Sequence, residues 1–416
     1  MKQASIPRLA PTALFVLPIL FGLCALLAAP ALAQPPATAP FDRTIIVGGG
    51  GTDAANGTAL LTAVNDALAA VPAPSAGNPW LIKVEPGIFD LGSQTLQLQS
   101  WIDIEGSGRN ATFIRSGGSV FVPAPATVNA ASGVNSELRN LTVQYFSNIV
   151  GGIGIQNAST ELKLTQVNVE VEASDSATGV LSTAGNPRLS AVFSRVSSTN
   201  GGVATGFAIR SGAPVVLEMF VFIKNETQRE NIGISVSNGA APVLEKISGV
   251  VFGGSRNIGI LSSGSSPSIT NNRWTVSNGE AIGVLVPLVP ATILRPVVEL
   301  KESTIEATNA SRAIGLSNES GGSATRVEVK DTTIRASASQ FAAALPIAAR
   351  NVNNGSFTKI DQSVLDARIA LSNQTAGTTF QVGASQLAGV RNIIAGSTAV
   401  CAASYDIAYT TLPPGC

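Results

Sequence analysis

The sequence contains no histidine among its 416 residues. Imidazole is the usual base of serine and cysteine triads and a common zinc ligand, so those classes of enzyme are excluded. Aromatic residues make up 5% of the chain and charged residues 12%, while 26 basic residues balance 26 acidic residues. A neutral chain with no basic stretch lacks the charge pattern that nucleic-acid binding requires. We therefore expect no nucleic-acid partner.

Cysteine is also scarce, with three residues, Cys24, Cys401 and Cys416. Cys24 lies in the apolar N-terminal run, and the other two are close together near the C-terminus. A catalytic thiol would need an activating base such as histidine, which is missing. In an oxidising compartment Cys401 and Cys416 are expected to pair. We predict that residues 401–416 form a disulfide-closed C-terminal cap.

The sequence has one long apolar run, at its N-terminus from Ala13 to Ala29. Two basic residues precede it, and Ala31-Leu32-Ala33 follows as a small-x-small cleavage site, which predicts a signal peptide over residues 1–33. A membrane anchor is the alternative, but Pro18 interrupts the run and a span needs about 20 residues. We expect a protein exported to the periplasm or the cell exterior, with a linker at 34–43 and no membrane span in the mature chain.

Beyond the linker, one segment has helical periodicity, from Asp53 to Val71. Its apolar residues recur at three- and four-residue spacing, and two prolines follow it. The rest of the chain is rich in glycine and β-branched residues, which favours strands and turns. The apolar positions of the helix are Leu60, Leu61, Val64, Leu68 and Val71.

The chain also repeats itself, with two markers in phase. A glycine followed by an aliphatic residue or phenylalanine recurs at steps of 24 to 32 residues, at Gly154, Gly179, Gly206, Gly233, Gly259, Gly283 and Gly315. Two apolar positions seven residues apart recur with it, at Leu162/Val169, Leu189/Val196, Val216/Ile223, Leu244/Val251, Ile269/Val276, Val298/Ile305, Val327/Ile334, Thr358/Leu365 and Phe380/Leu387.

Such a period predicts a β-solenoid, in which strands of successive coils pair about 4.8 Å apart and like side chains stack in columns. Leucine-rich repeats, helical repeats and β-propellers do not fit the step or the composition. We predict an all-β fold, a right-handed parallel β-helix over residues 44–400. Its first coil would be covered by the capping helix 53–71, and glycine and asparagine would supply the positive φ of its corners.

The segments KVEPGIFDLG and IDIEGSGRNATFI, which follow the helix, carry a resemblance. Together with the cap helix and the repeats they resemble the right-handed parallel β-helix proteins of the pectin lyase-like superfamily, and they are most similar to the first strands of pectinesterases. The resemblance implies the fold and a link to polysaccharide. The motif positions are Val84, Pro86, Gly87, Phe89, Ile104, Gly106, Gly108, Thr112 and Ile114.

The catalytic motifs of these relatives are missing. The chain lacks the Gln-Asp-Thr, Asp-Phe-x-Phe-Gly and Gly-Arg-Pro-Trp strands of pectinesterases, the histidine of polygalacturonase-type hydrolases and the acidic calcium strand of pectate lyases. No catalytic residue is therefore carried over from the resemblance, and whether the protein is an enzyme is left open.

The densest acidic set lies on the strand VNVEVEASD, with Glu170, Glu172 and Asp175. Strand alternation turns both glutamates outward, where a carboxylate pair suits acid/base chemistry or calcium binding. Ordinary solvent-facing residues are the alternative interpretation. At equal offset from the repeating glycines stand Glu170, Arg195, Phe222, Gly249 and Thr275, which form no acidic column.

These observations favour a non-catalytic exported β-helix that associates with polysaccharide or with the cell envelope, and that needs no cofactor. A polysaccharide-active enzyme, a lyase or esterase on acidic glycans such as pectin, is the alternative. Its candidate catalytic residues are Glu170, Glu172 and Asp175.

Overall fold

The computed structural model describes residues 43–117, 126–148, 151–225, 229–288, 296–320, 325–338 and 345–416. They belong to one compact unit, Phe41–Cys416. The predicted signal peptide, Cys24 and linker residues 34–42 lie outside the described residues, so these assignments stay predictions. Within the described ranges no helix is long and apolar enough to cross a membrane.

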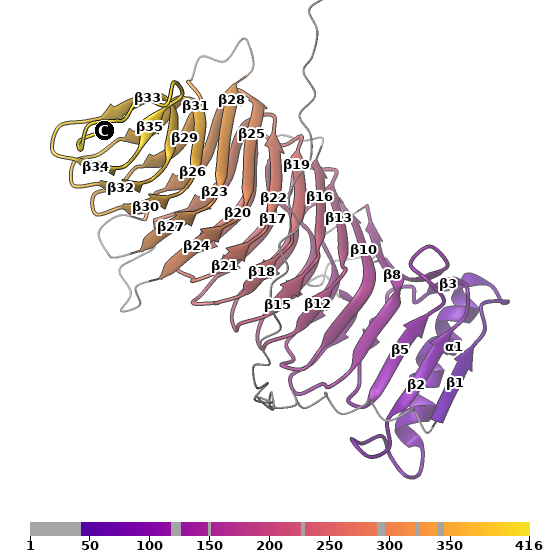
Figure 1. The fold of residues 1–416 in the computed structure, drawn as a ribbon. Coiled ribbons are helices and arrows are strands. Elements are labelled where there is room, and N and C mark those ends of the chain that lie inside the picture. The colour runs from indigo at the N-terminus through magenta and orange to yellow at the C-terminus, as the bar shows by residue number, and fades with distance from the viewer. Residues whose placement is uncertain are drawn as a thin grey trace, which may run out of the picture. The chain divides into compact units, whose positions relative to one another are not determined.

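The strands stack in three columns, and within each column the strands of successive coils pair in parallel (Figure 1). Column 1 consists, in stacking order, of β1 (Arg43–Val47), β2 (Trp80–Val84), β5 (Ile102–Gly106), the first part of β8 (Glu137–Ser147), the first part of β10 (Lys163–Ala173), β12 (Arg188–Ser190), β15 (Val215–Leu217), β18 (Val243–Glu245), β21 (Ser268–Thr270), β24 (Val297–Lys301), β27 (Arg326–Lys330), β30 (Phe357–Asp361), β32 (Thr379–Gly383) and β34 (Thr398–Ala402).

Each coil then turns into column 2. Column 2 consists of β3 (Gly87–Asp90), β6 (Thr112–Ser116), the second parts of β8 and β10, β13 (Phe193–Ser198), β16 (Phe220–Asn225), β19 (Ser248–Phe252), β22 (Arg273–Ser277), β25 (Thr304–Ala310), β28 (Thr333–Ala338), the first part of β31 (Val364–Asn373), the first part of β33 (Gln386–Ile393) and β35 (Tyr405–Asp406).

Column 3 completes each coil and carries the repeating glycines. It consists of β4 (Leu96–Gln97), β7 (Ala126–Ala130), β9 (Gly152–Asn157), β11 (Ala177–Ser182), β14 (Ala204–Ile209), β17 (Glu230–Ser237), β20 (Arg256–Ser263), β23 (Glu280–Val286), β26 (Arg312–Asn318), β29 (Ile347–Asn351) and the second parts of β31 and β33. The predicted right-handed parallel β-helix is therefore confirmed.

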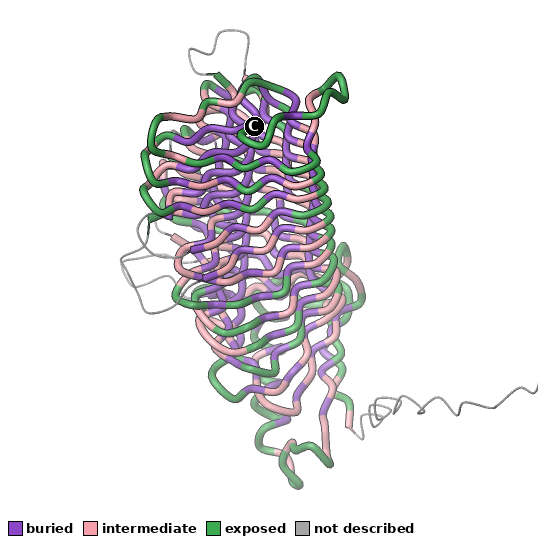
Figure 2. The backbone as a smooth tube through the Cα atoms, turned by 60° about the vertical axis from the view of Figure 1, so that its left-hand side comes forward, coloured by how far each residue is buried: buried purple, intermediate pink, exposed green. Residues whose placement is uncertain are grey.

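The interior is filled by aliphatic columns, and Figure 2 shows the buried residues lining the inside of the coils. The marker pairs stack in register from Leu189/Val196 to Ile269/Val276, and again from Val298/Ile305 to Phe380/Leu387. The register of the marker pairs slips by two residues at two places, before Leu189/Val196 and after Ile269/Val276. Side chains alternate with a period of two, so each slip keeps the same face buried. The true partners at the slips are Leu164/Val171 before Leu189/Val196, and Leu300/Ala307 after Ile269/Val276.

The glycine column is confirmed, because the repeating glycines of column 3 stand opposite one another in successive strands. A Cβ on Gly206 would lie 2.6 Å from the carbonyl oxygen of Gly233 in the next coil and would also meet Val221. The same approach recurs up the column, with 2.5 Å between a Cβ on Gly283 and the oxygen of Gly315. Glycine is needed here for close approach inside a strand.

At the corner between columns 3 and 1, glycine has the predicted positive φ, for example at Gly185, Gly212 and Gly239. Another set of corners differs from the expectation. The corner between columns 1 and 2 has a positive φ of 43° to 58° in eleven successive coils, and none of these residues is glycine. In eight of the coils the corner amide donates to a carbonyl of the next coil at 2.9 to 3.2 Å, which offsets the strained backbone. The corner residues are Asn140, Gln166, Ala191, Glu218, Lys246, Asn271, Glu302, Asp331, Gln362, Ala384 and Ala403.

The helix α1 (Asp53–Ala69) covers the first coil and contacts β1, β2 and β3. Thr52 caps it by accepting the amide of Ala55. Its buried stripe includes Leu60 and Val64, as predicted, together with smaller residues. Leu68 is 41% exposed and Val71 lies beyond the helix at 88%, so these two positions of the predicted stripe were wrong. The helix ends at Ala69, two residues before the predicted end at Val71, which precedes Pro72 and Pro74.

The C-terminal disulfide is confirmed. Cys401 of β34 is bonded to Cys416, with their Cα atoms 5.2 Å apart. The amide of Cys401 donates to the carbonyl of Pro414, and the amide of Leu412 to that of Ser404, both at 2.8 Å. The tail therefore lies along the last coil. The domain boundary at residue 401 stays a prediction, since β34 extends across it.

We expect Gly206→Ala to lower the free energy of unfolding by about 2–3 kcal/mol, because overpacking in a core costs roughly that amount. The measurement is urea unfolding followed by circular dichroism. Gly77→Ala is the matched control, since nothing lies within 4 Å of a Cβ at Gly77. Equal midpoints for the two variants would contradict the proposed close approach.

Candidate functional site

The outer face of column 2 over β8, β10, β13, β16 and β19 is the candidate site, and is called the column-2 face below. Its strands are aligned residue for residue, so their outward side chains form rows across the coils. The offset comparison was correct from Glu170 to Phe222, but the next member of this row is Val250, not Gly249. The outward residues are Thr142, Gln144, Phe146, Asn168, Glu170, Glu172, Phe193, Arg195, Ser197, Phe220, Phe222, Lys224, Ser248, Val250 and Phe252.

Five phenylalanines gather on this face, although aromatic residues are rare in the chain. The rings of Phe193 and Phe220 stack at 5.4 Å with planes 4° apart, and Phe222 meets Phe252 edge-on at 5.5 Å. Phe146 is 38% exposed and Phe220 37%. This gathering of half-buried and exposed rings makes the column-2 face a candidate binding surface.

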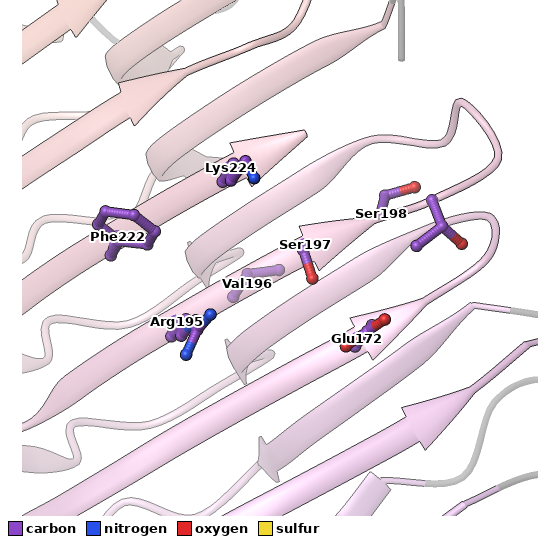
Figure 3. A pocket seen from close by; sticks show the side chains of 8 residues that line it. Glu172, Arg195, Val196, Ser197, Ser198, Phe222 and Lys224 are labelled. Atoms are coloured by element: carbon purple, nitrogen blue, oxygen red, sulfur yellow. The ribbon is translucent and has the colours of Figure 1, made fainter. Parts of the chain in front are cut away.

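A hollow of about 230 Å³ lies beside one of these rings, Phe222. Figure 3 shows that its charged side chains come from three successive strands: Glu172 from β10, Arg195 from β13 and Lys224 from β16. Phe222 and the hydroxyl of Ser197 line it as well. Among the described residues, neither Glu172 nor Arg195 has a hydrogen-bond or ion-pair partner. The hollow thus combines an aromatic wall with a carboxylate and a guanidinium that are free to meet a ligand.

The three predicted acidic residues separate in the structure. Glu172 lines the hollow. Glu170 accepts a hydrogen bond of 2.8 Å from Gln144 Nε2, and Gln144 in turn accepts one from Arg115. Asp175 is exposed after β10 and is outside the lining.

No group of three or more carboxylate or thiol side chains in the described ranges is placed to hold a metal ion. Glu170, Glu172 and Asp175 do not form such a group.

A second charged set was missed by sequence reasoning, on the outer face of column 1. Arg139 of β8 donates to Glu105 of β5 from Nε at 2.9 Å and from Nη2 at 2.8 Å, and its Nη1 lies 3.1 Å from Glu137. Asp103 is 3.7 Å from the same guanidinium. The signal lay in the i, i+2 spacing of Asp103/Glu105 and of Glu137/Arg139. These coils precede the repeating glycines, so their alignment was not visible.

Burial raises the pKa of the Asp103 carboxyl above its ordinary value, and the charge of Glu137 adds to the effect. The hydrogen bond from the Glu137 amide and the charges of Arg139 and Lys163 oppose it. A raised folded-state pKa means that the stability this carboxyl contributes is present below its unfolded pKa and is lost as pH rises through its folded pKa.

Asp103→Asn removes an ionisation that burial disfavours. The free energy of unfolding of this variant should therefore rise relative to that of the wild type between pH 3 and pH 7. Thermal unfolding at both pH values measures this. Glu105→Gln is the comparison, since it weakens the two hydrogen bonds from Arg139 and should lose stability at pH 7. If Asp103→Asn is less stable than the wild type by a larger margin at pH 7 than at pH 3, the raised pKa of Asp103 is refuted.

Comparisons with known proteins place the fold. No protein-family model matches the chain, and no curated protein matches it in sequence. The A-module of the mannuronan C-5 epimerase AlgE4 from Azotobacter vinelandii superposes with a TM-score of 0.53 at 14% identity, over 88% of this chain and 96% of that chain. DFA-IIIase from Arthrobacter chlorophenolicus A6, in complex with DFA-III, gives 0.53 at 12%, over 89% and 96%. At these identities the likeness shows the parallel β-helix fold, and no relation to pectinesterases is shown.

Proposed function

We propose that the protein is exported and binds polysaccharide on the column-2 face without turning it over. Membership of the pectin lyase-like superfamily is part of the same proposal, supported by the shared fold and by the motifs of the first coils. The N-terminal sequence pattern and the Cys401–Cys416 disulfide support export to the periplasm or the cell exterior.

The observation that carries the proposal is the hollow lined by the Phe222 ring, Glu172 and Arg195, on a face where four further phenylalanines gather. Binding sites combine apolar and aromatic walls with a few convergent polar groups that fix orientation. Sugar rings have the matching chemistry, with apolar C–H faces and hydroxyl edges. The rows continue over five strands, which suits an extended polymer.

The charges of the hollow favour an acidic polysaccharide. Arg195 offers a planar guanidinium that can bind a carboxylate through two parallel hydrogen bonds. Lys224 adds a second cation on the next strand. Glu172 is available to accept hydrogen bonds from sugar hydroxyls.

Binding without hydrolysis is supported by the number of carboxylates. Glycoside hydrolysis uses two carboxyl groups on either side of the bond. Glu172 is the sole carboxylate among the described residues that line the hollow, because Glu170 bonds to Gln144 and Asp175 lies outside.

A lyase acting on acidic glycans is the second candidate, favoured by the convergence of Glu172, Arg195 and Lys224 on one hollow. Arg195 would hold the uronate carboxylate, and Glu172 would accept the proton from the adjacent carbon. The glycosidic C–O bond at the next carbon would then break to leave an unsaturated end, and Lys224 would donate a proton to the departing oxygen.

The test uses the mature protein from Gln34 onward. Affinity electrophoresis in polygalacturonate, pectin or alginate, with and without calcium, measures binding. We expect Arg195→Ala and Phe222→Ala each to weaken polygalacturonate binding about tenfold, which corresponds to about 1.4 kcal/mol for one charge-assisted contact or one stacked ring. Tyr409→Ala is the matched aromatic control, because Tyr409 is 75% exposed and lies away from this face.

Turnover is measured on the same glycans by methanol release, new reducing ends and absorbance of unsaturated products. We expect none above background. If unsaturated product forms with the wild type and disappears in Glu172→Gln, the protein is a lyase and the proposal of binding without turnover is wrong. Unchanged binding in Arg195→Ala and Phe222→Ala, with unfolding midpoints equal to the wild type, would contradict the column-2 face as the site.

A further inference from the structure

Stacked charges in this β-helix follow a rule. Among the described strands, fifteen register pairs join two charged residues, and twelve of the fifteen pairs have opposite signs. The longest run is Glu230, Arg256, Glu280 and Arg312, joined by ion pairs of 3.0 to 3.4 Å. Opposite charges across a β pair stabilise it and like charges oppose it, so the remaining three pairs need a reason.

Two of the three like-charged pairs lie in neighbouring rows, where ion pairs along the strands offset their repulsion. Lys301 stacks on Lys330, and Glu299 stacks on Glu328 in the neighbouring row. Lys301 bonds to Glu299 at 2.7 Å, and Glu328 to Arg326 at 2.6 Å. Their charges are neutralised along the strands.

The third pair, Lys163 on Arg188, has no ion pair of this kind among the described residues, although the charge of Lys163 acts on the Asp103 carboxyl. Both side chains are exposed at the start of their column 1 strands, and neither forms an ion pair within 4 Å with a described carboxylate. Glu137 stacks below Lys163 but directs its carboxylate to Arg139 and Thr165. Two like charges one β spacing apart are left facing solvent.

These two cations line a hollow of about 560 Å³ at the corner between columns 3 and 1. Asn135, Thr160 and Asn186 line it with neutral polar groups, and Glu161 is its one carboxylate. Asn186 is fixed from the next coil, since its Oδ1 accepts the amide of Ala213 at 2.7 Å. Its amide nitrogen is thereby left to donate.

We propose that this hollow binds an oxyanion group carried by a polymer, namely a sulfate ester, a phosphate ester or a carboxylate. The anion supplies the negative charge that the other cationic stack, Lys301 on Lys330, receives from protein carboxylates. Lys163 and Arg188 contact the anion from successive coils, and the asparagines bind its remaining oxygens. The site lies on a different column from the column-2 face, so it does not depend on the proposed function.

The test compares the binding of dextran sulfate, dextran phosphate, polygalacturonate and neutral dextran by titration calorimetry. We expect at least one anionic polymer to bind and neutral dextran not to bind, and the three anionic arms identify the group. Lys163→Ala/Arg188→Ala should weaken binding at least tenfold. Lys301→Ala/Lys330→Ala, which removes a stack of the same geometry, should leave binding unchanged.

Arg188→Glu provides a readout that a merely structural role would not give. It converts the like-charged stack into one of opposite sign, so the unfolding midpoint without polymer should rise while polymer binding is lost. The proposal is overturned if no anionic polymer binds the wild type or if neutral dextran binds equally well. It is also overturned if both double variants lose equal affinity, or if the midpoint of Arg188→Glu falls.

Discussion

Main-chain pairing between successive coils is the constraint on which this structure depends. Inside the stack, a residue in a strand generally stands opposite a residue of the coil before and a residue of the coil after, one β spacing away. A side chain is therefore one member of a row, and its neighbours in space are fixed by register. Inward rows must stack apolar groups without voids, and outward rows place whatever chemistry the sequence carries side by side.

The same constraint explains where backbone freedom is used. Column 3 needs glycine because a Cβ at Gly206 or Gly283 would meet the carbonyl of the next coil. The corner between columns 1 and 2 tolerates a positive φ at Glu218 or Lys246, because the amide of each bonds to the next coil at 3.1 Å. At this corner the hydrogen bond to the next coil therefore makes a positive φ tolerable without glycine.

Much of the fold follows from the sequence for this reason. The glycine steps, the apolar pairs and the helix at 53–71 are local signals of a repeated coil. The two register slips were not predictable from spacing, because a shift of two residues keeps the same face and leaves the apolar pattern intact. The first coils lack the glycine marker, which hid the set around Arg139.

The candidate site was predicted only in part. Alternation correctly turned Glu172 outward, and the equal offset placed Arg195 in the row of Glu170. The register adds that Glu172, Ser197 and Lys224 form the neighbouring row, which brings the charged residues to one hollow. Hydrophobicity alone would place Phe220 and Phe222 in the core. They face outward because Val221 and Ile223 fill the interior of the same strand.

The most direct test of the column-2 face is hydroxyl-radical footprinting of the mature protein with and without polygalacturonate. Phenylalanine rings are oxidised where solvent reaches them. The account predicts that Phe146, Phe220 and Phe222 become protected by the glycan, while Tyr409, exposed near the C-terminus, does not. Protection of Tyr409 with no change at the three phenylalanines would contradict it.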